Sequence, residues 1–146
     1  MGSISHGTMR NEDLIPEFVS MLEQFAKKAK NMHHLALCKE ISARMEEDGY
    51  FVSEDADYDL NEDLFNALND YAAPYFYFGS HPGDGSDYGF WLDEDMEDHF
   101  DGIKVADLSE VPKDYAGEIL MVNDHGNTSL YVKARTQEPR EVWALV

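Results

Sequence analysis

The chain has 146 residues, with 30 Asp or Glu against 11 Lys or Arg, and a formal net charge of -19. Because 43% of the residues are apolar and 12% are aromatic, this acidity is not that of a disordered chain, which lacks aromatic residues. The charge argues against direct binding to nucleic acid or to an anionic membrane, and no apolar run is long enough to predict a membrane span. Charged partners are expected to be basic.

The first eight residues, Met1–Thr8, are small, polar and without pattern, and Met9 is a natural start. We expect them to be a remnant of expression that takes no part in the fold. Residues 9–146 are then expected to form a single acidic domain of ordinary size. The lone Cys38 cannot form an internal disulfide and no secretory leader is recognised, so a cytoplasmic protein is expected.

Helical patterns come first along the chain. Apolar residues recur at spacings of three and four over Glu12–Asp48, which indicates one long helix or a helical hairpin with its break near Asn31. Tyr50–Ser53 is expected to be a short strand. A second helix is expected to begin at Asp59, because Asp59 and Glu62 have the spacing of a capping box.

Strand patterns follow. Tyr75–Phe78 and Tyr88–Leu92 are aromatic and flank a turn-rich stretch, and Asp93–Asp101 is expected to be an acidic loop or short helix. Three more strands are expected at Glu118–Val122, Ser129–Lys133 and Glu141–Val146. This order predicts an α+β fold, with N-terminal helices packed on a C-terminal antiparallel sheet of about five strands.

The negative charge is concentrated in one stretch. Between Met45 and Ile103 there are 18 acids and no Lys or Arg, whereas the remainder holds 12 acids and 11 bases. The same stretch contains 13 of the 18 aromatic residues, so we expect it to be folded and to display its carboxylates on a rigid surface. The alternative is an interaction module whose acidity serves only its solubility.

We predict that a set of carboxylates from this stretch contacts a basic partner. The set is Asp55, Asp57, Asp59, Asp84, Asp87, Asp93, Glu94, Asp95, Glu97, Asp98 and Asp101. Duplex DNA carries about one charge per 1.7 Å of its axis, so eighteen carboxylates match roughly 30 Å of duplex. A domain of this length is roughly 35 Å across, so a face that imitates DNA is sterically feasible.

A small metal-dependent enzyme is a further alternative. It would be centred on the Gly-rich loop His81–Asp87, where His81, Asp84 and Asp87 could chelate a divalent metal together with His99 or His125. No HExxH or CxxC spacing supports a metal site, and no nucleophile has a recognisable neighbouring base. We therefore predict no catalytic residue, no metal ligand and no cofactor.

Two strings resemble small acidic proteins encoded by bacteriophages and bacterial genomes: YFYFGSHPGDGSDYGFW, from Tyr75 to Trp91, and VNDHGNTSLY, from Val122 to Tyr131. The resemblance covers about the C-terminal half, and it implies a phage or mobile-element origin without an established active site. We expect a non-catalytic DNA mimic or anti-defence inhibitor in the host cytoplasm. Its partner would be the basic surface of a nucleic-acid-binding host protein; no direct contact with nucleic acid or membrane is expected, and a homodimer is left open.

Overall fold

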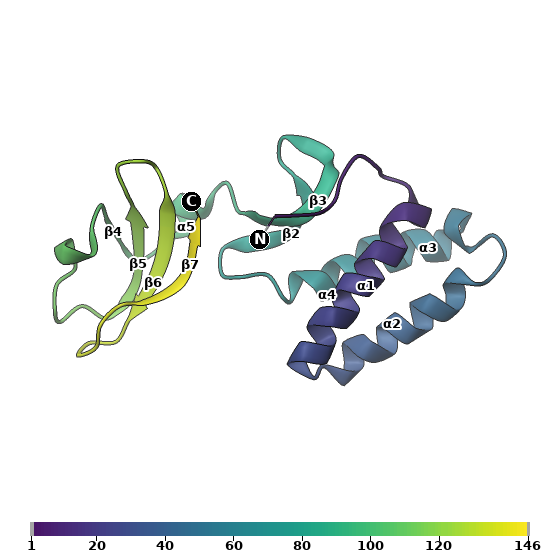
Figure 1. Cartoon of the computed structure of the whole chain (residues 1–146), viewed down its shortest axis with the longest axis horizontal. Coiled ribbons are helices and arrows are strands. Elements are labelled where there is room, and N and C mark those ends of the chain that lie inside the picture. The colour runs from purple at the N-terminus through teal and green to yellow at the C-terminus, as the bar shows by residue number, and fades with distance from the viewer. Residues whose placement is uncertain (1, 146) are drawn as a thin grey trace. The chain divides into compact units, whose positions relative to one another are not determined.

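The computed structural model describes residues 2–145, which form two compact units (Figure 1). The first unit ends at Glu94 and the second begins at Asp95. Each unit contains its own sheet, whereas the sequence predicts one domain with one sheet. The α+β class is confirmed, with the long helices in the N-terminal part.

The two long helices of the first unit, α1 (Asn11–Ala29) and α2 (Met32–Met45), form a helical hairpin. α1 ends because Lys30 adopts the left-handed conformation, with φ 57°. Asn31 then caps α2, since its side-chain oxygen accepts a hydrogen bond from the His34 N–H at 3.1 Å. Of the two alternatives for this stretch, the structure has the hairpin.

The next part of the first unit is helical throughout. A turn of 3-10 helix, η1 (Tyr50–Val52), precedes α3 (Glu54–Tyr58), the π-helical turn η2 (Asp59–Leu64) and α4 (Phe65–Asn69). The predicted strand over residues 50–53 is therefore wrong. The predicted helix start at Asp59 is also wrong, because Ser53 caps α3 by accepting from the Ala56 N–H at 3.2 Å.

A three-stranded antiparallel sheet completes the first unit, in the order β1 (Gly2–Ser5), β3 (Asp84–Leu92), β2 (Phe76–His81). The two predicted strands are present in β2 and β3, but both extend into the predicted turn, which is reduced to Pro82 and Gly83. β1 lies within the eight residues that the prediction left out of the fold, and it pairs with the free edge of β3.

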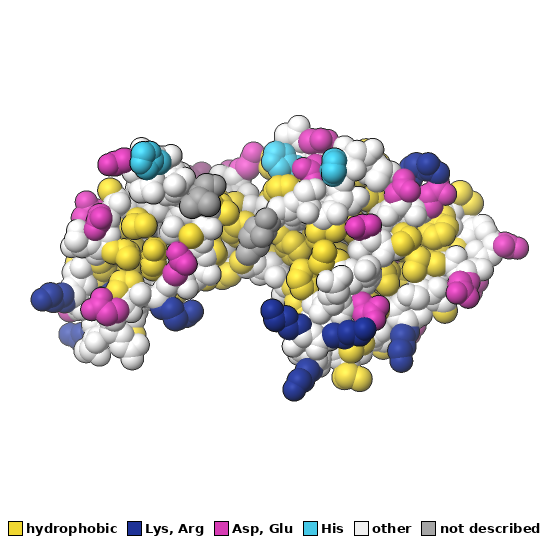
Figure 2. Space-filling model, in the orientation of Figure 1, with side chains coloured by type: hydrophobic (Ala, Val, Ile, Leu, Met, Phe, Trp, Pro, Cys, Tyr) yellow, Lys and Arg dark blue, Asp and Glu magenta, His cyan; other side chains and the backbone are white. Residues whose placement is uncertain are grey.

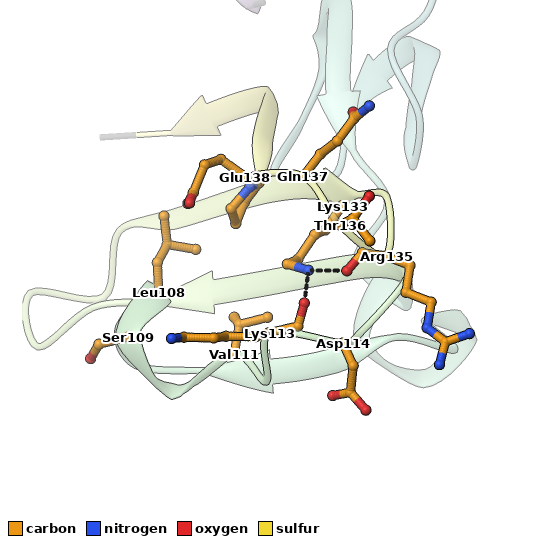
Figure 3. A pocket seen from close by; sticks show the side chains of 11 residues that line it. Leu108, Ser109, Val111, Lys113, Asp114, Lys133, Arg135, Thr136, Gln137 and Glu138 are labelled. Atoms are coloured by element: carbon orange, nitrogen blue, oxygen red, sulfur yellow. Dashed lines mark hydrogen bonds between the residues drawn. The ribbon is translucent and has the colours of Figure 1, made fainter.

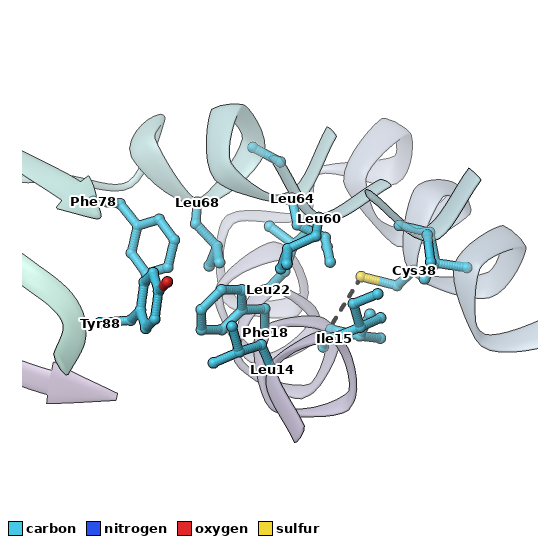
Figure 4. Close-up of a cluster of buried hydrophobic side chains, with 14 of the residues drawn as sticks. Leu14, Ile15, Phe18, Leu22, Cys38, Leu60, Leu64, Leu68, Phe78 and Tyr88 are labelled. Atoms are coloured by element: carbon cyan, nitrogen blue, oxygen red, sulfur yellow. Dashed lines mark hydrogen bonds between the residues drawn. The ribbon is translucent and has the colours of Figure 1, made fainter. Parts of the chain in front are cut away.

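Phe18 of α1 lies at the centre of the core of this unit (Figure 4). Its ring centroid is 5.1 Å from that of Phe78 on β2 and 5.7 Å from that of Tyr88 on β3. Other fully buried members come from α1 and from the second helical stretch: Leu14, Ile15, Leu22, Leu64 and Leu68. The long helices thus pack on the three-stranded sheet, which corrects the prediction that they cover the C-terminal sheet.

The second unit contains α5 (Met96–His99), β4 (Ile103–Val105), η3 (Leu108–Glu110), β5 (Gly117–Val122), β6 (Thr128–Lys133) and β7 (Arg140–Leu145). Its four strands lie in the order β4-β5-β6-β7. β4 runs parallel to β5, and the other neighbours are antiparallel. The three predicted strands are present, although Val146 lies outside the described residues. One antiparallel sheet of about five strands is wrong: there are two sheets, of three and four strands.

Candidate functional site: an acidic helical segment

Residues 46–70 form the most acidic continuous part of the first unit, and we call them the acidic helical segment. They include ten acids and no Lys or Arg. Eight of these acids are exposed: Glu46, Glu47, Asp48, Glu54, Asp55, Asp57, Glu62 and Asp70. The remaining two differ, since Asp63 is half-buried and Asp59 is buried.

The segment is fixed to the core through its apolar side. Leu64 and Leu68 are fully buried, and Ala56 and Leu60 lie with them in the core cluster. The first turn of α3 carries three acids, which suits the partial positive charge at a helix N-terminus. Glu54, Asp55, Asp57 and Glu62 therefore stand on a helical frame whose other side is held by the core, whereas Glu46, Glu47 and Asp48 lie in the turn between α2 and η1.

Asp59 is a buried structural residue of the acidic helical segment and is not part of its surface. Only 2% of the residue is exposed, and Arg44 Nη1 donates to its Oδ1 at 2.7 Å. The Tyr50 hydroxyl donates to its Oδ2, also at 2.7 Å. Burial, and then this hydrogen bond to Asp59, hold the pKa of Tyr50 well above its usual range. Asp59 is thus not available to a partner, which corrects its place in the predicted contact set.

The exposed acids of the segment lack compensating charges. Arg44 is the base next to the segment, and its guanidinium is already shared between Asp59 at 2.7 Å and Glu40 at 3.9 Å. Among the described residues, no ion pair involves Glu46, Glu47, Asp48, Glu54, Asp55 or Glu62. Burial and the neighbouring Asp59 also raise the pKa of Asp63.

Four of the six basic residues of the first unit lie near the end of α1 or on α2, away from Arg44 and Arg10. Lys27 and Lys28 occupy the last turn of α1, Lys30 follows it, and Lys39 lies on α2. On the face drawn in Figure 2, basic side chains are grouped around the connection between α1 and α2. Acidic and basic side chains are therefore separated within the folded first unit as well as along the sequence.

Several other predicted contact residues have local structural roles. Asp84 accepts hydrogen bonds from the Ser86 N–H at 3.0 Å and hydroxyl at 2.8 Å, and these lower its pKa. Asp87 accepts from the Ser3 hydroxyl. Asp57 is exposed but accepts from the side chain of Asn11 at 2.8 Å. Asp84 and Asp87 thus serve the β2–β3 hairpin and its pairing with β1.

The remaining predicted residues lie at the division between the units. Asp93 and Glu94 end the first unit and are exposed, while Asp95, Glu97, Asp98 and Asp101 belong to the second. α5 is held by the buried side chains of Met96 and Phe100 on either side of its acids. Glu97 pairs with Lys104 at 3.5 Å. Seven of the eleven predicted residues thus belong to the first unit and four to the second.

The Gly-rich loop His81–Asp87 contains the tight turn that joins β2 and β3. His81 Nδ1 accepts a hydrogen bond from the Gly83 N–H at 2.9 Å, and its ring packs edge-on against Trp91 with centroids 4.6 Å apart. His99 and His125 lie in the second unit. Within residues 2–145, no three His, Cys, Asp or Glu side chains are grouped so that they could hold a metal ion.

The second unit contains a cavity of about 670 Å³ between residues 108–114, which precede β5, and the β6–β7 turn (Figure 3). Lys133 lies in its wall, 7% exposed, and its ammonium donates to the carbonyls of Lys113 at 2.7 Å, Tyr115 at 3.0 Å and Arg135 at 3.3 Å. The charged ends of Lys113, Asp114 and Arg135 point in different directions in Figure 3. The cavity thus lacks the convergent polar groups of a small-molecule site, and Lys133 serves to tie its two walls together.

Comparison with known proteins found no relative: no family model, no curated protein and no solved structure matches this chain. In the described part of the chain, no helix has both the length and the apolar character needed to cross a membrane.

Proposed function

We propose that this is a non-catalytic binding protein whose acidic helical segment occupies a basic, nucleic-acid-binding surface of a partner protein. The observation that carries the proposal is the set of exposed carboxylates without ion pairs in a segment that Asp59 and the core hold in place. Bound there, the protein would exclude the nucleic acid by occupying its site.

The number of available charges supports this proposal for the first unit alone. The acidic helical segment has eight exposed acids. At about one charge per 1.7 Å of duplex axis, they correspond to roughly 14 Å of DNA. That is somewhat less than half of one helical turn.

Such a surface acts mainly by attraction at a distance. Unpaired carboxylates on a rigid frame accelerate encounter with a basic surface and discriminate against acidic ones. The attraction is screened within about 8 Å at physiological salt, so binding should weaken steeply as salt is added. The resemblance to phage-encoded proteins adds the proposal that the partner is a host defence protein, such as a restriction or CRISPR component.

The test compares two variants with the same change in net charge. The first neutralises four acids of the segment, by Glu47→Gln, Asp48→Asn, Asp55→Asn and Glu62→Gln. The matched control neutralises four exposed acids of the second unit, by Asp114→Asn, Asp124→Asn, Glu138→Gln and Glu141→Gln. Each protein is immobilised and exposed to host lysate at low salt, and the bound proteins are identified.

We expect the unchanged protein and the control variant to retain the same nucleic-acid-binding protein, and the segment variant to lose most of it. Equal loss from both variants would mean that net charge alone acts, and it would refute a role for this segment. Retention by the segment variant would refute it as well.

A further inference from the structure

A second surface of the first unit is a groove along the helical hairpin, with a volume of about 440 Å³. α1 contributes Glu23 and Lys27 to its walls, and α2 contributes a longer row of residues. That row comprises Met32, Leu35, Ala36, Cys38, Lys39 and Ser42. From the first to the last of these, α2 rises roughly 15 Å at about 1.5 Å per residue, so the groove is longer than two turns of a helix.

This groove combines apolar surface with positive charge. Its apolar lining includes the buried Cys38 and also Met32, of which 74% is exposed. Lys39 is exposed and forms no ion pair among the described residues, whereas Lys27 is paired with Glu23 at 2.6 Å. The groove therefore joins an apolar lining to at least one uncompensated ammonium, in a chain whose net charge is -19.

The acidic helical segment has the complementary character. It carries two exposed apolar side chains, Val52 with 91% of the residue exposed and Tyr58 with 60%. Within residues 2–145 the large apolar side chains that are exposed number four, and Met32 in the groove is a third of them. Between Val52 and Tyr58 the chain carries the exposed acids Glu54 and Asp55, neither of which forms an ion pair among the described residues. One surface is thus apolar and basic and the other apolar and acidic, so that each complements the other.

We propose that Val52–Tyr58 of one copy of this chain docks in the groove between α1 and α2 of a second copy. Val52 and Tyr58 would cover the apolar lining of the groove, and Asp55 would face Lys39. The helix in this stretch, α3, has five residues and is shorter than the groove. Apolar side chains supply the anchors when a helix binds in a groove, and the charges around them fix its orientation.

The occupant must be a second copy, because the two surfaces of one copy are fixed apart. Ile41 of α2 and Ala56 of α3 belong to the same core cluster, so a chain cannot place its own α3 in its own groove. Each copy would present its segment to one neighbour and its groove to another, which makes the contact head-to-tail. The proposal does not require the basic partner proposed above, although that partner would compete with the groove for the same segment.

The experiment disables each surface separately in the full chain. Lys27→Glu with Lys39→Glu reverses the charge of the groove. Val52→Ser with Tyr58→Ser removes the exposed apolar pair of the segment and leaves every carboxylate in place. Self-association is measured by sedimentation velocity at low salt, at protein concentrations up to about 1 mM, where even weak association is detected. Circular dichroism at 222 nm checks that each variant is folded.

We expect the unchanged chain to associate, and each variant alone to associate about tenfold or more weakly, because loss of an interface anchor commonly has an effect of that size. An equimolar mixture of the two variants should form a complex of one copy of each with the affinity of the unchanged chain, since it pairs one intact segment with one intact groove. The matched control for net charge is Arg135→Glu with Arg140→Glu, which changes two exposed bases of the second unit. The control should associate within about threefold of the unchanged chain, because distant charges are screened.

Three results would overturn the proposal. The first is an unchanged chain that stays monomeric at about 1 mM. The second is an equal loss in the control, which would mean that net charge alone acts. The third is a mixture that associates no more tightly than either variant alone, which would place the contact on other surfaces. If the double change in the groove reduces the helical signal, Lys39→Glu alone replaces it. Capture of a basic partner is tested with the carboxylate variants instead, so either proposal can fail without the other.

Discussion

Replacing Asp59 tests whether this buried carboxylate holds the acidic helical segment in place. Asp59→Ala removes the acceptor of both the Tyr50 hydroxyl and the Arg44 guanidinium. Asp59→Asn keeps the shape and one acceptor oxygen but removes the charge. Asp55→Asn is the matched control, since Asp55 lies one helical turn earlier, is exposed and has no ion pair among the described residues.

The magnitude follows from the burial of each partner. Tyr50 is 4% exposed, so Asp59→Ala leaves a buried hydroxyl without its acceptor, at a cost of about 1–3 kcal/mol. Arg44 has 37% of its side chain exposed, so solvent replaces part of its lost ion pair and the further cost is at most about 1 kcal/mol. We expect a total of about 1–4 kcal/mol for Asp59→Ala, about half of that for Asp59→Asn, and a change within about 0.5 kcal/mol for Asp55→Asn.

The assay is urea unfolding followed by circular dichroism at 222 nm, because all helices except the short α5 and η3 lie in the first unit. For a unit of this size, 1–4 kcal/mol also corresponds to a melting temperature lower by roughly 5–30 °C. If Asp59→Asn and Asp55→Asn had the same stability, the carboxylate of Asp59 would not hold the segment, and the rigid-frame reasoning would fail.

Three further predictions concern other groups. Because the pKa of Tyr50 is raised in the folded protein, the unfolded chain loses this proton first, so stability should fall as the pH rises above about 10; Tyr50→Phe should make that decline shallower in urea unfolding series between pH 8 and pH 10.5. Lys133→Met should destabilise the second unit by about 1–3 kcal/mol, seen in the fluorescence of Trp143 but not in the helical signal, because several carbonyls lose their donor. Neutralising Asp93, Glu94, Asp95, Glu97 and Asp98 together should weaken partner capture less than the four changes in the acidic helical segment do, since these acids are divided between the two units.

The elements that the sequence predicts well are those with a regular apolar period. The recurrence of Phe18, Leu22 and their neighbours indicates a helix facing a core, and α1 has this form. The aromatic runs around the Gly-rich turn likewise predict the β2–β3 hairpin. In both cases the pattern is local, and local patterns determine which face of an element is buried.

The features that were predicted wrongly all depend on contacts between residues that are distant in the sequence. β1 has no strand-forming composition and is defined by the edge of β3, more than eighty residues later. Asp59 resembles its acidic neighbours in sequence, and its burial depends on Arg44 and Tyr50, which adjoin it only in the folded unit. The division into two sheets was missed for the same reason, since a strand pattern does not specify which strands pair.

The role of Lys133 could be anticipated only in part. Its position at the end of a predicted strand gives no sign that its ammonium is enclosed by backbone carbonyls. The sequence offers only an indirect signal: the turn that follows Lys133 and the turn around Lys113 and Tyr115 supply carbonyls without strand partners.

The proposed occupation of a nucleic-acid-binding surface is tested most directly by competition. The protein that the immobilised chain retains from host lysate is purified, and its affinity for the chain is measured with increasing duplex DNA and increasing salt. We predict that DNA and the chain exclude each other, and that affinity falls steeply between 50 and 200 mM salt, as it does for proteins that contact many phosphates. Simultaneous binding of DNA and the chain, or an affinity that salt does not change, would contradict the proposal.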